Sequence, residues 1–111
     1  MPEREKIIYC ERYRQLGNYL TLQGFYSKAL EHFQIALSYY EYCFPDDIDA
    51  EQYLLSIRHA CLNNAALCSC NLLMYREAIQ YGTQVIRESK GTNAKAYYRR
   101  AQAFRGLDQY E

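Results

Sequence analysis

The amino-acid sequence predicts an all-α fold in which antiparallel helix pairs stack into a solenoid. Two segments, residues 24–30 and 73–79, can be aligned residue by residue. Apolar residues recur at the spacing of three and four that is typical of helices, and no segment alternates with the period of a strand. Because a repeated helix pair buries its apolar face only against its neighbours, these repeats indicate a stacked array.

Small residues give the register of the repeats. Gly17 aligns with Ala66, and a third copy has Ala101 at the same position. We expect these three residues where two helices approach closely. The 35 positions from Ala66 to Ala101 are close to the period of about 34 of a tetratricopeptide repeat. The 49 positions from Gly17 to Ala66 leave about fifteen extra residues between the first two repeats.

Aromatic residues mark the start of the second helix of each pair. Tyr26 aligns with Tyr75, Ala29 aligns with Ala78, and Tyr110 has the same place in the third copy. We therefore expect the three tyrosines at the hairpin turns. The expected helices cover residues 3–22, 26–43, 48–71, 75–89 and 93–106.

Apolar stripes and a stop signal support these elements. One stripe follows residues 13–20 and another follows residues 29–40, each with the spacing of a helix face. Pro45 then breaks the helix, and Asp46 or Asp47 can cap the next helix. We expect the extra residues to lengthen the second helix of the first repeat and the first helix of the second.

The length predicts one domain, residues 1–111. The chain reaches Glu111 where a sixth helix is expected to begin, so we expect a piece of a larger protein or an end covered by another chain. An apolar edge of Phe104, Leu107 and Tyr110 is a candidate surface for self-association. The two full repeats and the partial third are expected at about 3–43, 48–89 and 93–111.

Composition excludes several classes of function. The formal net charge is zero and the pI is about 6.7, so no global field favours nucleic acid or an anionic membrane. No apolar stretch has the length of a membrane span, and residues 1–20 lack the apolar centre of a signal peptide. The five cysteines are odd in number and spread along expected helices, which predicts free thiols in the reducing cytoplasm.

No catalytic or cofactor site is expected. Cys68 and Cys70 are one residue too close for the usual zinc pair, and no second pair completes a site. His32 and His59 lie on separate expected helices, and the sequence has no nucleophile–base pair or Gly-rich phosphate loop. We therefore expect a binding module that is not an enzyme, with no cofactor. A prolyl isomerase domain, active or decayed, would lie outside this chain.

Five polar side chains fall on the first helices of the three repeats: Arg14 and Asn18, then Asn64, then Lys95 and Arg99. Residues four apart share a helix face, so two of these helices each offer a two-point contact. Cations and amide donors together suit a carboxylate with several lone pairs. The pattern predicts a local anion site in a chain without net charge.

The whole chain resembles the tetratricopeptide-repeat (TPR) domains of chaperone cofactors. Residues 16–20 and 93–103 are very close to the first- and third-repeat signatures of FKBP-type and cyclophilin-type immunophilins and of the aryl-hydrocarbon-receptor-interacting protein. The inserted length between repeats one and two is also similar to that group. The resemblance implies a TPR solenoid that forms a right-handed superhelix with a concave groove.

That family binds peptide ends with a "carboxylate clamp", and four of its five positions match here in kind: Asn18, Asn64, Lys95 and Arg99. Arg14 stands where the family usually has Lys, and Arg is larger and planar. The neighbouring Asn63 is not the clamp residue, because the register of Tyr75 and Ala78 selects Asn64.

The ligand that the resemblance implies is the Glu-Glu-Val-Asp tail of heat-shock chaperones, with the ninety-kilodalton class favoured over the seventy-kilodalton class. Arg14, Asn18, Asn64 and Lys95 would hold the terminal carboxylate and last Asp, and Arg99 would reach the peptide backbone or an upstream acidic side chain. Taken singly, each residue is also compatible with an ordinary solvated helix surface. The alternative function is a general scaffold that binds an internal segment of a client protein.

Overall fold

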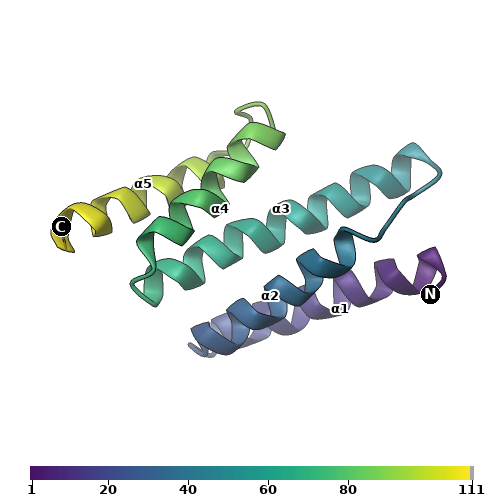
Figure 1. Cartoon of the computed structure of the whole chain (residues 1–111), viewed down its shortest axis with the longest axis horizontal. Helices are drawn as coiled ribbons and strands as arrows, with labels where there is room; N and C mark the ends of the chain where they lie inside the picture. The colour runs from purple at the N-terminus through teal and green to yellow at the C-terminus, as the bar shows by residue number, and fades with distance from the viewer. Residues whose placement is uncertain (111) are drawn as a thin grey trace.

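The structure is a computed structural model that describes residues 1–110, apart from the side chain of Tyr110. These residues form five α-helices and no strand: α1 (Glu3–Leu22), α2 (Tyr26–Tyr40), α3 (Ile48–Asn71), α4 (Tyr75–Glu88) and α5 (Ala94–Tyr110). Consecutive helices pack antiparallel, and α3 lies between the α1–α2 pair and the α4–α5 pair (Figure 1). This is the TPR-like helical repeat that the sequence predicts.

The helices form two layers. The long α3 contacts both α1 and α5 in addition to its chain neighbours α2 and α4. Helices α1, α3 and α5 therefore form one layer, which we call the α1–α3–α5 layer, and α2 and α4 form the other. The molecule is elongated, with extents of 46 × 30 × 18 Å.

Three sets of buried residues have members on α3. Phe33 of α2 and Cys10 of α1 pack with Ile57 and Cys61 of α3 in the largest cluster. Leu62 and Cys70 of α3 each belong to a smaller cluster with residues of α4 and α5. Because α3 contributes to all three clusters, it fixes the place of α1 relative to α5, and it therefore positions the candidate site.

The two helical hairpins close with the same backbone geometry. Gly24 has a φ of 83° and Leu73, its aligned partner, has a φ of 63°. The amide of Phe25 donates to the carbonyl of Leu20 at 2.9 Å, and the amide of Met74 donates to that of Ser69 at 2.8 Å. A left-handed residue with this bond is a common helix end. Tyr26 and Tyr75 start α2 and α4, which confirms their expected place at the turns.

The expected lengthening of the second helix is wrong. Helix α2 has 15 residues and α4 has 14, so the two are equivalent. The extra length lies in the 24-residue α3 and in the link 41–47. Pro45 disfavours helix at the residue before it, and α2 ends at Tyr40 rather than 43. Asp47 caps α3, since its Oδ1 accepts from the Ala50 amide at 2.8 Å.

The expectation for the small residues holds for two of three. A Cβ on Gly17 would lie 2.6 Å from the Phe33 ring, and Ala66 is fully buried. Ala101 is exposed, because no described helix packs on that side of α5. The close approach of α5 to α4 occurs instead at Gly106, where a Cβ would overlap the Tyr75 ring.

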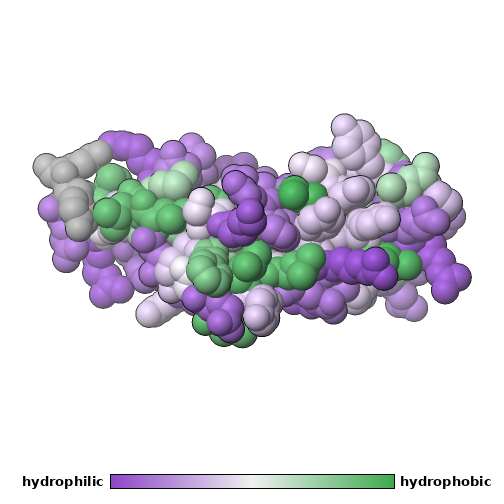
Figure 2. Space-filling view, turned by 90° about the horizontal axis from the view of Figure 1, so that it is seen from below, coloured by the Kyte–Doolittle hydropathy of each residue, from purple (hydrophilic) through white to green (hydrophobic). Residues whose placement is uncertain are grey.

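Several apolar side chains remain on the surface. Phe104 is 48% exposed, and Leu107 is half-buried, while the side chain of Tyr110 lies outside the described residues. Seen from below, hydrophobic residues form separate patches that hydrophilic residues interrupt (Figure 2). None of the described helices is long and apolar enough to cross a membrane.

Candidate functional site

All five predicted site residues lie in the α1–α3–α5 layer. Arg14 and Asn18 are on α1, Asn64 is on α3, and Lys95 and Arg99 are on α5. The α1 and α5 pairs each span one helical turn, so each pair shares a face. Helix α3 contacts both of these helices, which puts Asn64 on the element between them.

Arg14 is engaged by an acidic residue of its own helix. Its Nε donates to Glu11 Oε2 at 3.1 Å, and its Nη2 donates to Glu11 Oε1. These hydrogen bonds raise the pKa of Arg14 and lower the pKa of Glu11. Gln15 donates to Glu11 Oε1 at 3.1 Å, and Tyr53 of α3 also helps to lower the pKa of Glu11. The first cation of the predicted clamp is thus half of an ion pair.

The charges of this ion pair affect a buried cysteine of α3. Burial raises the pKa of Cys61 on α3 to about 12, while the charge of Arg14 opposes that rise and the charge of Glu11 adds to it. Both charges therefore act on the thiol of Cys61, which lies three residues before Asn64 on α3.

Asn64 and Lys95 line one hollow between α3 and α5, with a volume of about 370 Å³. Asn63 borders it too, but its amide has a structural partner: Nδ2 donates to Asn93 Oδ1 at 3.3 Å. Asn93 in turn caps α5 by accepting from the Ala96 amide at 3.1 Å. Asn63 thus links α3 to the start of α5. Asn64 and Lys95 line the hollow without such a bond between the two helices.

Asn18 and Lys95 are exposed and have no hydrogen bond or ion pair with any described side chain. Arg99 is half-buried, and its Nη1 donates to Gln102 at 3.3 Å. Its guanidinium lies 5.2 Å from the ring centre of Tyr98. Among the three predicted cations, Arg14 is thus the one that a carboxylate already opposes, Arg99 has neutral partners, and Lys95 has no internal partner among the described residues.

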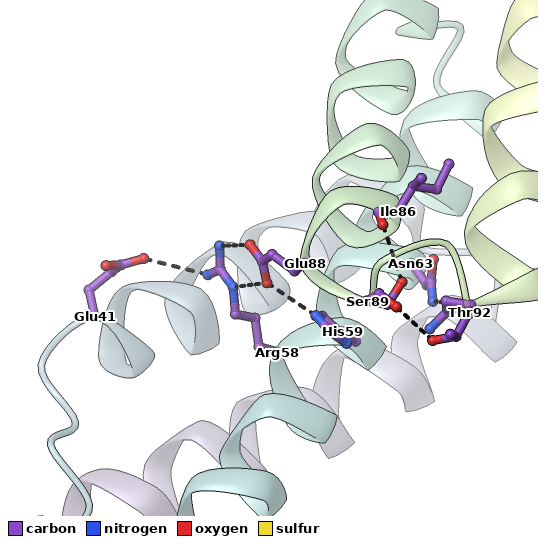
Figure 3. A network of polar contacts seen from close by, with 9 residues as sticks. Glu41, Arg58, His59, Asn63, Ile86, Glu88, Ser89 and Thr92 are labelled. Carbon is purple, nitrogen blue, oxygen red and sulfur yellow. Dashed lines mark hydrogen bonds and ion pairs between the residues drawn. The ribbon is translucent and has the colours of Figure 1, made fainter.

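A polar network that the sequence did not suggest joins α3 to α4, the helix that follows it in the other layer (Figure 3). Arg58 of α3 donates to Glu88 of α4 through Nε at 2.9 Å and Nη2 at 2.8 Å. His59 Nε2 lies 3.1 Å from Glu88 Oε1, and Arg58 also reaches Glu41 at 3.5 Å. The hydrogen bonds from Arg58 lower the pKa of Glu88. The network fixes α3 against α4 beside the hollow.

Sequence reasoning also missed Glu11. The signal was present, because a carboxylate three residues before an Arg on a helix lies within reach of it. No group of three or more His, Cys, Asp or Glu side chains in residues 1–110 has an arrangement that could hold a metal ion.

The fold and the polar residues define a TPR-like helical-repeat module with a layer that carries amides and cations. No protein-family model matches the chain. A search of curated proteins finds similarity to the Hsp70/Hsp90 co-chaperone cns1 of Schizosaccharomyces pombe, with 31% identity over 102 residues. The alignment covers 92% of this chain and 25% of that protein, so the chain spans about a quarter of the length of this relative.

Proposed function

We propose that this chain is a co-chaperone adaptor module that binds the free acidic C-terminal end of a heat-shock chaperone in the groove of the α1–α3–α5 layer. The observation that carries the proposal is the hollow shared by Asn64 and Lys95, because it joins an amide and an unpaired cation from two helices that are far apart in sequence. The similarity to an Hsp70/Hsp90 co-chaperone supports the same partner class.

The chemistry of a peptide end fits these groups. Lys95 and Arg14 would pair with the terminal carboxylate and the last Asp, and Asn18 and Asn64 would donate to the remaining lone pairs. Arg99 would contact the peptide backbone or an upstream acidic residue. Each hydrogen bond to a charged group contributes about 1.5–3 kcal/mol, so four or five are ample for a complex of about micromolar affinity after the ordering cost.

The test is calorimetric titration with the peptide Glu-Glu-Val-Asp carrying a free carboxyl end, compared with the same peptide amidated. We expect the free acid to bind and amidation to abolish most of the binding. Equal affinity for both would instead favour the alternative function, a scaffold that binds an internal segment of a client protein without a terminal carboxylate.

A charge reversal at Lys95 checks the site itself. Lys95→Glu should remove binding of the free-acid peptide, since it sets a carboxylate in the hollow beside Asn64. The matched control is Lys28→Glu on α2 in the other layer, where Lys28 is exposed and its side chain lies outside the α1–α3–α5 layer. Loss of binding in both variants would point to non-specific charge attraction.

The finer features of the proposal follow from the resemblance. We infer a cytoplasmic module of the immunophilin-like, FKBP-type group, without catalysis of its own, that prefers the ninety-kilodalton chaperone. Titration of the two chaperone tails in parallel tests the preference. Self-association through the edge of Phe104, Leu107 and Tyr110 stays a prediction, and light scattering over a concentration series tests it.

A further inference from the structure

In the ion pair between Glu11 and Arg14, the carboxylate of Glu11 takes up two hydrogen-bond donors of Arg14, one of the predicted clamp cations. The Nε and Nη2 groups of Arg14 form the fork that matches a carboxylate, and both donate to Glu11. The two side chains are only 26% and 21% exposed, so the pair is partly shielded from solvent. A carboxylate of the chain thus already has the position that a ligand carboxylate would need.

A second side chain holds Glu11 in this place. Gln15 donates to it at 3.1 Å from the same helix. The carboxylate therefore has two hydrogen-bonding partners, Arg14 and Gln15, which sets it apart from a free surface residue. Lys95 and Asn18 have no such internal partner among the described residues, so Arg14 is the predicted clamp cation that a carboxylate of the chain already opposes.

We propose that Glu11 is an internal competitor for Arg14 that lowers the affinity of the groove for an acidic peptide end. This inference rests on the proposed function, since it concerns the same groove. A ligand carboxylate gains the Arg14 fork only by displacing Glu11 or by sharing the guanidinium with it. A side chain that keeps the shape but loses the charge should release Arg14 and strengthen binding.

The experiment compares wild type with Glu11→Gln by calorimetric titration with the free-acid Glu-Glu-Val-Asp peptide. We expect the variant to bind about fivefold more tightly, the upper end of what a partly exposed ion pair contributes. The matched control is Glu31→Gln, which makes the same change of net charge on α2, where Glu31 is exposed. It should leave the affinity unchanged. Unchanged or weaker binding by Glu11→Gln would overturn the proposal.

A second substitution separates competition from simple repulsion. In an Arg14→Ala background, Glu11→Gln should no longer strengthen binding, because there is no guanidinium to release. If the gain persists there, Glu11 acts by long-range repulsion and the competitor role is wrong. Thermal unfolding of each variant checks that the fold is retained.

The outcomes keep the two proposals apart. If wild type binds the free acid and the amidated peptide equally, the clamp function fails, whatever Glu11 does. If wild type prefers the free acid but Glu11→Gln gives no gain, the clamp function stands and the competitor role alone is overturned.

Discussion

Removal of the Glu88 carboxylate is expected to loosen the contact between α3 and α4. Glu88→Gln keeps the shape but sets an amide NH₂ against the guanidinium of Arg58, whose side chain is 10% exposed. The loss of one partner of a fully buried pair costs about 3–5 kcal/mol, and exposed pairs are worth about 0.2–1 kcal/mol.

The structure places this pair between those limits. Glu88 is 27% exposed, and Arg58 keeps the Tyr40 ring 4.9 Å from its guanidinium carbon. We therefore expect the free energy of unfolding to fall by about 2 kcal/mol, between the buried and exposed cases. Urea unfolding followed by circular dichroism at neutral pH measures it.

The matched control is Glu41→Gln, which removes the other carboxylate near Arg58. Glu41 is 67% exposed and lies 3.5 Å away, so its loss should cost less than about 0.5 kcal/mol. If Glu88→Gln costs no more than Glu41→Gln, the reasoning from burial and bond geometry is refuted.

The same pair makes a signed prediction for pH. The hydrogen bonds from Arg58 lower the pKa of Glu88 below its ordinary 4.5 in the folded chain. A group with a lowered folded pKa stabilises the fold above its unfolded pKa and loses that contribution as the pH falls through the folded value. The stability gap between wild type and Glu88→Gln should thus be full at neutral pH and close progressively below pH 4.5. A gap that stays constant in acid would contradict the assignment.

Three further predictions concern packing, backbone and thiols. Gly17→Ala should lower the unfolding free energy by about 1 kcal/mol, because overpacking against Phe33 exceeds the gain of about 1 kcal/mol in helix propensity; urea unfolding checks it. Leu73→Gly should raise the unfolding free energy by up to about 1 kcal/mol, because glycine relieves the strain of a left-handed φ. A higher midpoint of thermal unfolding would show this gain. Burial raises the pKa of Cys10 and Cys61 to about 12, so these thiols should react with an aromatic disulfide at pH 8 only after denaturation in urea.

The repeat alignment predicted the backbone more reliably than the lengths of the helices. Gly24 and Leu73 have the same turn conformation, although one residue suits it and the other does not. The alignment of the flanking tyrosines was enough to predict this turn, because the hairpin is closed by backbone bonds rather than by particular side chains. By contrast, the length inserted between the repeats has no periodic partner, so the alignment could not divide it between α2 and α3.

The same limit explains the error at Ala101. The alignment identified a position that is small in each copy, but contact at that position depends on a second helix of the pair. In the first two repeats this helix is present, and Gly17 and Ala66 are buried. For α5 the contact in the described chain comes from the other side, where Gly106 meets Tyr75. A repeat pattern thus predicts which face a residue occupies, while burial depends on the neighbour that covers it.

The candidate site shows where the predictive power of a motif ends. The spacing of Arg14 and Asn18 gives the face of α1 on which both lie, since that follows from helix geometry alone. The direction of a long side chain within that face depends on the nearest complementary charge, and for Arg14 this is Glu11. A clamp motif should therefore be read together with the residue three positions before each cation. For Arg14 that residue is Glu11, so we expect a ligand carboxylate to compete with Glu11 for the guanidinium.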